Sequence, residues 1–159
     1  MDQLVITSGF RIVSGGQTGA DRAGLDWAIA RGVEHGGWCP RRRTAEDGQI
    51  PLRYALTETP SSGYPQRTEW NVRDSDATVV FTISDDLTGG SLLTVKCAAK
   101  LKKPCIHISA RMHPKYLAQF LSQHSVRTLN VAGQRESNAP DIYGRVFEVL
   151  DASLVVRAD

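Results

Sequence analysis

The chain has 159 residues, 41% of them hydrophobic, which suits one compact domain spanning residues 1–159. Its formal net charge is only +2, and its aromatic residues do not alternate with a basic stripe, so we expect no nucleic-acid partner. No stretch is apolar enough to span a bilayer, and Met1–Thr7 does not resemble a signal peptide, so we expect a cytoplasmic protein that binds no membrane.

The first predicted strand, Phe10–Val13, leads through a glycine-rich turn into a helix expected over about 20–31. The turn reads Ser14-Gly15-Gly16-Gln17-Thr18-Gly19-Ala20-Asp21. A helix start offers unpaired N–H groups and a positive dipole end, and glycine lets a phosphate approach the backbone, so the turn is a candidate anion site. No lysine follows Gly19 as in a P-loop, and the dinucleotide fingerprint lacks its first glycine. A tight turn that binds no ligand is the alternative.

After a second strand, predicted over 33–38, the segment from Cys39 to about Pro65 shows no clear period. Loops of this length often cover ligands. The triplet Arg41-Arg42-Arg43 within it is either a solvated surface turn or a clamp for an anionic ligand. A short helix, predicted from Gln66 to about Ser75, carries Arg67 and Glu69 beside the next strand, so both are candidate binding residues.

A second strand–glycine–helix junction follows. The strand is predicted over 77–83, and Thr88-Gly89-Gly90-Ser91 then begins a helix that runs to about Lys102. Thr88 or Ser91 could simply cap this helix. Two such junctions in one small domain nevertheless favour a ligand-binding role for both.

The remaining pattern predicts a strand over 104–108, a helix near 114–122, a strand over 128–131 and a helix over about 140–150. Alternating strands and helices indicate an α/β fold, a three-layer sandwich with a mainly parallel sheet. In the common strand order 2-1-3-4-5, both glycine junctions flank the point where such sheets bind ligands. The sequence therefore predicts a pocket for a phosphorylated small molecule.

Metal and catalytic motifs are absent from the sequence. The three cysteines form no Cys-x-x-Cys, and the four histidines lack helical ligand spacing, so we predict no metal site and reduced thiols. No Ser-x-x-Lys, Gly-x-Ser-x-Gly or His-Glu-x-x-His occurs, so we assign no catalytic residue.

Several longer motifs are distributed over nearly the whole chain. They are Val13 to Ala23, Gly36-Gly37-Trp38-Cys39-Pro40, Ala45-Glu46-Asp47-Gly48, Leu56-Thr57-Glu58-Thr59, Arg67 to Asp76, Leu87-Thr88-Gly89-Gly90-Ser91 and Asn130-Val131-Ala132-Gly133-x-Arg135-Glu136-Ser137. Together they resemble the molybdenum carrier (molybdenum cofactor carrier) family, which is similar to circularly permuted members of the SLOG superfamily.

This resemblance implies a Rossmann-like fold that binds, stores or delivers molybdenum cofactor, a phosphorylated molybdopterin, without turnover. It also implies a homo-oligomer, with a tetramer favoured, and molybdenum enzymes as partners. The general frequency of oligomers favours a dimer instead. The alternatives are a nucleotide sensor and a hydrolase that cleaves a nucleoside monophosphate with Glu69 or Asp21. The related phosphoribohydrolases carry Pro-Gly-Gly-x-Gly-Thr-x-x-Glu, whereas Leu87–Leu92 of this chain is followed by no nearby glutamate.

The candidate residues suggest how such a ligand is held. We expect its phosphate on the amides of Gly16–Gly19 or of Gly90–Ser91, with the Thr18 or Ser91 hydroxyl as a further donor. Asp21 either stabilises the helix start or accepts hydrogen bonds from the donor edge of a ring.

Further residues could contact the molybdenum end of such a cofactor or another subunit. Cys39 is the cysteine best placed to approach molybdenum as a thiolate. Arginines 41–43, 67, 73 and 135 could hold a second, oxo-metal anion. Trp27 lies off the expected buried face of its helix, so we expect subunit contacts to cover it.

Overall fold

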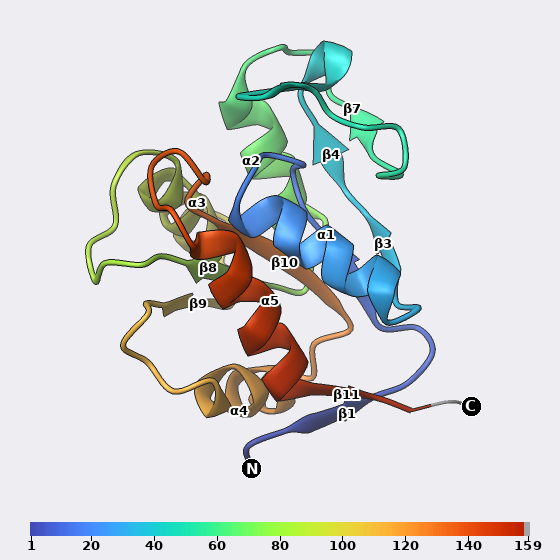
Figure 1. Cartoon of the computed structure of the whole chain (residues 1–159), viewed down its shortest axis with the longest axis vertical. Coiled ribbons are helices and arrows are strands. Elements are labelled where there is room, and N and C mark those ends of the chain that lie inside the picture. Colours follow the sequence, from blue (N-terminus) through green and yellow to red (C-terminus); the bar gives the residue numbers. More distant parts are fainter. Residues whose placement is uncertain (158–159) are drawn as a thin grey trace.

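The structure is a computed structural model that describes residues 1–157, and it shows a parallel sheet between two helical layers (Figure 1). All neighbouring strands of the five-stranded sheet are parallel. Their order across the sheet is β3 (Glu34–Gly36), β2 (Arg11–Val13), β10 (Thr128–Gly133), β8 (Ala77–Phe81) and β9 (Cys105–Ile108). The predicted three-layer, Rossmann-like α/β sandwich is confirmed.

Within residues 1–157, five α-helices cover the sheet, each within about three residues of its predicted bounds. One layer holds α1 (Ala20–Ala30), α4 (Lys115–Gln123) and α5 (Ile142–Ser153). Figure 1 shows α1 and α5 side by side in front of β10. The other layer holds α2 (Tyr64–Arg73) and α3 (Gly89–Lys100), which pack against each other.

The predicted strand order 2-1-3-4-5 was wrong, because the last strand of the sheet, β10, lies in its centre. It pairs with β2 on one side and with β8 on the other. The burial pattern of a strand indicates that both faces are covered, but it does not specify the neighbours. The loops that follow β2 and β8 therefore flank β10.

The two faces of the central strands differ in polarity. Val79 and Phe81 of β8 and Val131 of β10 belong to the main apolar cluster beneath α1, α4 and α5. On the opposite face, the Asn130 side-chain amide donates to the Thr78 hydroxyl at 3.2 Å. The α2 and α3 layer therefore packs on a partly polar floor.

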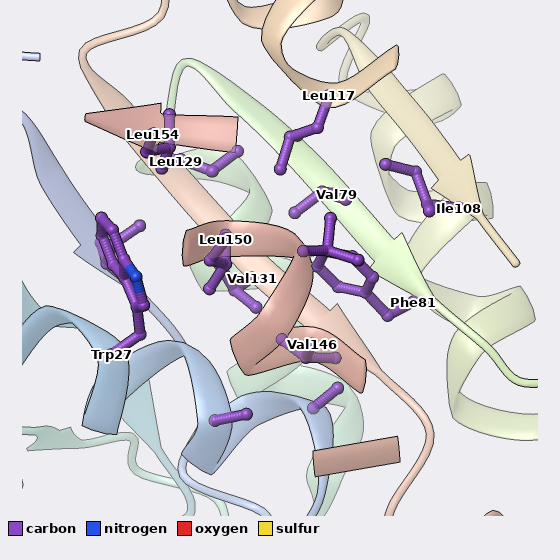
Figure 2. Packing of buried hydrophobic residues seen from close by; sticks show 14 of the residues in the cluster. Trp27, Val79, Phe81, Ile108, Leu117, Leu129, Val131, Val146, Leu150 and Leu154 are labelled. Atoms are coloured by element: carbon purple, nitrogen blue, oxygen red, sulfur yellow. The ribbon is translucent and has the colours of Figure 1, made fainter. Parts of the chain in front are cut away.

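The apolar cluster contains Trp27, whose side chain is fully buried (Figure 2). Its indole N–H donates to the Asp151 carboxylate of α5 at 3.2 Å. The expectation that Trp27 needs another subunit was wrong, because α5 covers it. A homo-oligomer stays a prediction without that support.

Three short strand pairings outside the main sheet were not predicted from the sequence. They are β1 (Leu4–Ile6) with β11 (Leu154–Val156), β4 (Trp38–Cys39) with β7 (Thr57–Glu58), and β5 (Thr44–Ala45) with β6 (Gly48–Gln49). A 3₁₀ turn spans Arg41–Arg43. Within residues 1–157, every helix is too short or too polar to cross a membrane.

Two helix glycines allow a matched test of packing. A Cβ on Gly24 of α1 would lie 2.8 Å from the Val131 side chain, whereas a Cβ on Gly144 of α5 would meet nothing within 4 Å. Alanine is the better helix former by about 1 kcal/mol. We expect Gly144→Ala to raise the free energy of unfolding by about that amount. Gly24→Ala should lower it, because overpacking costs about 1–3 kcal/mol. Chemical denaturation measures both, and a stabilised Gly24→Ala would contradict the packing of α1 on β10.

Candidate ligand-binding site

A cavity of about 560 Å³ opens over the carboxyl end of β10, between α2 and the start of α3. Segments from both glycine junctions line it. The lining residues are Gly15, Gln17, Asp21, Tyr64, Pro65, Arg67, Thr68, Asn71, residues 88–91, Leu93, Thr94, residues 130–135 and Asn138. This volume and this mixture of polar and apolar walls suit a small organic ligand.

The first glycine junction is closed on itself. The Gln17 amide donates to the Asp21 carboxylate at 3.1 Å, and the Thr18 amide donates to the Gln17 side-chain oxygen at 3.1 Å. Gly16 has a φ of 82°, and a Cβ there would lie 2.8 Å from the side chains of Ile50 and Leu56. Gly16 therefore serves the packing of the turn, and the wall of the cavity is formed by Gly15 and Gln17 instead.

The other members of this turn also face the protein. A Cβ on Gly19 would meet the backbone of residues 134–136, and the Thr18 hydroxyl accepts a hydrogen bond from the Glu136 amide at 3.3 Å. Neither residue lines the cavity. A β-branched substitution at Gly16 or Gly19 would thus disturb the fold as well as any ligand.

Arg67 of α2 packs against this turn. Its Nη1 donates to the Gly15 carbonyl at 2.9 Å and lies 3.4 Å from the Asp21 carboxylate, and a Cβ on Gly15 would overlap its side chain. Its Nε is buried without a hydrogen-bond partner among the described residues. The guanidinium also lies over the Tyr64 ring, 5.1 Å from its centroid.

Asp21 is a buried carboxylate at the start of α1. Burial raises the pKa of Asp21, although the charge of Arg67 and the hydrogen bond from the Gln17 amide act in the opposite direction. Its Oδ2 accepts from both of these groups. Of the two roles expected for Asp21, stabilising the helix start and the turn is the one that these contacts support.

The second glycine junction is open. Thr88 precedes α3 and makes no side-chain capping bond, and a Cβ on Gly89 or Gly90 would meet nothing within 4 Å. The first amides of a helix have no partner inside it, and they carry the positive end of the dipole. All four residues from Thr88 to Ser91 line the cavity. The start of α3 therefore presents backbone donors to the cavity.

Several lining residues were missed from the sequence, among them Tyr64, Asn130, Gln134 and Asn138. A polar residue in an apolar strand was the available signal for Asn130. The Gln134 side-chain oxygen accepts from the Ile83 amide at 2.8 Å, which ties the end of β10 to the loop after β8. That contact spans 51 residues, so no local pattern indicates it.

Glu69 was predicted to bind ligand, but the structure places it outside the cavity. It borders a separate shallow groove with Lys96, Cys97 and Lys100 on the outer side of α2 and α3. Cys39 also does not line the cavity, and it is fully buried in a cluster with Leu25 and Ile50.

Burial raises the pKa of the Cys39 thiol, so the thiolate expected to approach molybdenum is disfavoured there. Within residues 1–157, no group of three or more His, Cys, Asp or Glu side chains is placed to hold a metal.

The arginine triplet is a surface turn at Arg41 and Arg42, as one of the two expectations had it, whereas Arg43 is buried. Arg43 is buried and donates to the carbonyls of Ile50, Pro51, Tyr54 and Leu56 at 2.8–3.3 Å. Arg41 and Arg42 are exposed, and no residue from 39 to 63 lines the cavity. Of the six arginines expected near the ligand, Arg67 and Arg135 line the cavity, and Arg41, Arg42, Arg43 and Arg73 do not.

The β5–β6 hairpin is fastened beside the cavity. Arg22 of α1 holds the Asp47 carboxylate through two hydrogen bonds of 2.5 and 2.8 Å. Glu46 accepts from the Ser137 hydroxyl at 2.8 Å and lies 3.8 Å from Arg135. The long segment thus supports the rim of the cavity without forming its wall.

Comparison with known proteins assigns the chain to a family. Residues 12–154 match the model of the circularly permutated YpsA SLOG family. The chain belongs to this family. A crystal structure of a "putative molybdenum carrier protein" from Syntrophus aciditrophicus SB is similar, with a TM-score of 0.86 and 44% identity. The similarity covers 89% of this chain and 92% of that one. No match was found among the curated proteins.

The role of Arg43 in this SLOG-family chain can be tested against its exposed neighbour. Arg43→Met removes the donors to four carbonyls and leaves buried ones unpaired, at about 1–3 kcal/mol for each unsatisfied group. We expect a loss of at least about 3 kcal/mol in unfolding free energy and early proteolysis within 49–56. Arg41→Met should stay within about 0.5 kcal/mol of the parent. Equal stability of the two variants would show that Arg43 does not organise the segment.

The hairpin should loosen in acid. Hydrogen bonds from Arg22 lower the pKa of Asp47. Burial alone would raise the pKa of Glu46, but hydrogen bonds from Ser137 and Thr18 and the charge of Arg135 hold it lower. The stability that both carboxylates contribute is therefore fully present above their unfolded-state pKa values, 4.5 for Glu46 and 3.8 for Asp47. It is lost as pH falls through the lowered pKa values of the folded protein.

Amide hydrogen exchange of residues 44–49, corrected for intrinsic rates, should therefore speed up between about pH 6 and about pH 3. Since Asp47 is half exposed, we expect Asp47→Asn to cost at most about 1 kcal/mol at neutral pH and to remove part of this dependence. An unchanged acid profile in Asp47→Asn would exclude the Arg22 pair as its cause.

Proposed function

We propose that this chain binds molybdenum cofactor, a phosphorylated pterin, in the cavity over β10 and stores or delivers it without converting it. The observation that carries the proposal is the open start of α3, with the Gly89–Ser91 amides facing a cavity of about 560 Å³. The family match and the similar molybdenum carrier structure support this choice of ligand. Delivery to molybdenum enzymes and homo-oligomer formation belong to the same proposal.

The geometry favours the second junction as the phosphate site. The amides of Gln17 and Thr18 already have acceptors within their own turn, whereas the start of α3 is uncapped. A phosphate on the α3 amides would be stabilised by charge-assisted hydrogen bonds and by the helix dipole. Ser91 is buried beside these amides and could donate its hydroxyl to the same group.

Two arginines of the cavity wall are each paired with a carboxylate, Arg67 with Asp21 at 3.4 Å and Arg135 with Glu46 at 3.8 Å. Arg67 and Arg135 both line the cavity, and each guanidinium lies over the Tyr64 ring, at 5.1 and 5.4 Å from its centroid. These cation–π contacts hold the two arginines on the same side of the cavity. Tyr64, the first residue of α2, adds a flat aromatic surface that suits packing against a planar ligand ring.

A nucleoside monophosphate is the second candidate ligand, since it shares the phosphate and the fused ring. Its cleavage would need a carboxylate free to act on the bond. Glu69 lies outside the cavity, and the Asp21 Oδ2 accepts hydrogen bonds from Gln17 and Arg67. These contacts favour binding over hydrolysis. Incubation with nucleoside monophosphates, followed by assay for free base, tests the hydrolase alternative directly.

The phosphate site can be tested at Gly90. A valine Cβ there meets open space in the protein, and valine is no worse than glycine in a helix, so the fold should be kept. The added methyl groups would shield the first amides of α3. We expect Gly90→Val to weaken binding of metal-free molybdopterin at least about tenfold in calorimetry, with a smaller effect for Gly90→Ala.

Gly144→Val is the matched control, because it adds the same group to open space in α5. Unchanged affinity in Gly90→Val would exclude the α3 amides as the phosphate site. Native mass spectrometry of the protein from a molybdenum-replete host tests the carrier role itself. Tighter binding of a nucleoside monophosphate than of molybdenum cofactor would favour the nucleotide alternative.

A further inference from the structure

The Gln17 side chain is held in one orientation. It is only 6% exposed, and its oxygen accepts from two backbone amides, Thr18 at 3.1 Å and Glu46 at 2.9 Å. Because both neighbours are N–H donors, the oxygen must face them and the NH₂ group must point the other way. That nitrogen is buried without a partner in the described part of the chain, and Gln17 lines the cavity.

Arg67 of α2 also carries a buried donor without a partner in the described chain. It is 8% exposed, and its Nε is a second buried donor without a partner among residues 1–157. Buried donors without acceptors are rare and costly, at about 1–3 kcal/mol each. Four side chains within residues 1–157 carry such a donor, and two of them, Gln17 and Arg67, line this one cavity, which points to a ligand atom that accepts hydrogen bonds there.

The charge at this place is already balanced. The guanidinium of Arg67 is paired with the Asp21 carboxylate, whose Oδ2 lies 3.4 Å from Nη1. A second anion here would be close to the negative charge of Asp21, whereas a neutral oxygen would not be repelled. A carbonyl oxygen has two lone pairs and can accept from two donors at once, which a ring nitrogen cannot.

The two ends of the cavity are spaced for one fused ring with a phosphate arm. The turn after β2 and the start of α3 after β8 lie on opposite sides of β10. Two strand spacings, about 9–10 Å, separate β2 from β8. A phosphate at α3 would thus leave the far edge of its ring near Gln17.

We propose that Gln17 and Arg67 select a ring with an exocyclic carbonyl oxygen, as in a 4-oxopterin or a 6-oxopurine, over the same ring with an amino group. The proposal rests on the phosphate site at α3 described under Proposed function. It reverses the expectation that the Asp21 carboxylate accepts hydrogen bonds from the donor edge of the ring. At this end the protein offers donors, so the ligand supplies the acceptor.

Inosine and adenosine monophosphate form the test pair, because they differ at one edge of the purine, a carbonyl with a ring N–H in one and an amino group with a bare ring nitrogen in the other. We expect the parent protein to bind the inosine nucleotide at least about tenfold more tightly in calorimetry. Metal-free molybdopterin, which carries the same kind of carbonyl, should follow the inosine nucleotide. This comparison needs no variant.

Gln17→Glu then replaces the NH₂ group by an acceptor while keeping the oxygen that receives the Thr18 and Glu46 amides. We expect the variant to lose binding of the inosine nucleotide at least about tenfold and to prefer the adenosine nucleotide. Gln66→Glu is the matched control. The Gln66 oxygen also accepts a backbone amide, that of Ser61 at 2.8 Å, but Gln66 lies outside the cavity. It should bind both nucleotides like the parent.

The outcomes separate the two proposals. If the parent binds neither nucleotide nor molybdopterin, the proposed function fails and this inference fails with it. If the parent binds both nucleotides equally, or Gln17→Glu leaves the preference unchanged while it unfolds at the parental temperature, the carbonyl selection is wrong and the phosphate site stands. Should Gln17→Glu not fold, the parental ratio alone decides.

Discussion

The position of β10 between β2 and β8 is the constraint on which the site depends. It brings two junctions that lie about 70 residues apart in sequence to one edge of the sheet, with the end of β10 as the floor between them. The close approach of Gly24 to Val131 lets α1 pack directly on this strand. If β10 lay elsewhere in the sheet, the two junctions would be next to each other, and the end of β10 would not form the floor of the cavity.

The two faces of β10 have different roles in the fold. The α1, α4 and α5 face buries a continuous apolar cluster, which supplies most of the hydrophobic stabilisation. The α2 and α3 face has Asn130 and Thr78 at its centre, hydrogen-bonded to each other. Polar groups are tolerated there because they are paired. Of the four buried side-chain donors without a partner within residues 1–157, the two on Gln17 and Arg67 belong to side chains that line the cavity.

The two glycine junctions look alike in sequence but differ in the folded protein. In the first junction, glycines permit close packing, since Gly15 leaves room for Arg67, and Gly16 leaves room for Ile50 and Leu56. The Gln17 and Thr18 amides of this junction donate hydrogen bonds within the turn. In the second, Gly90 has no close neighbour and α3 begins uncapped. The same residue type thus makes room for neighbouring side chains in one case and borders open space in the other.

The sequence by itself determined the five helices, the strands of the main sheet and the two glycine junctions, because periodicity and glycine placement are local properties of the chain. Only the tertiary structure decided the strand order, the burial of Trp27 beneath α5, the removal of Glu69 and Cys39 from the site, and the orientation of Gln17. Each of these depends on a partner far along the chain, such as the Glu46 amide that fixes the Gln17 oxygen. Local patterns report how a segment is built, and long-range contacts decide which of its groups remain free to bind.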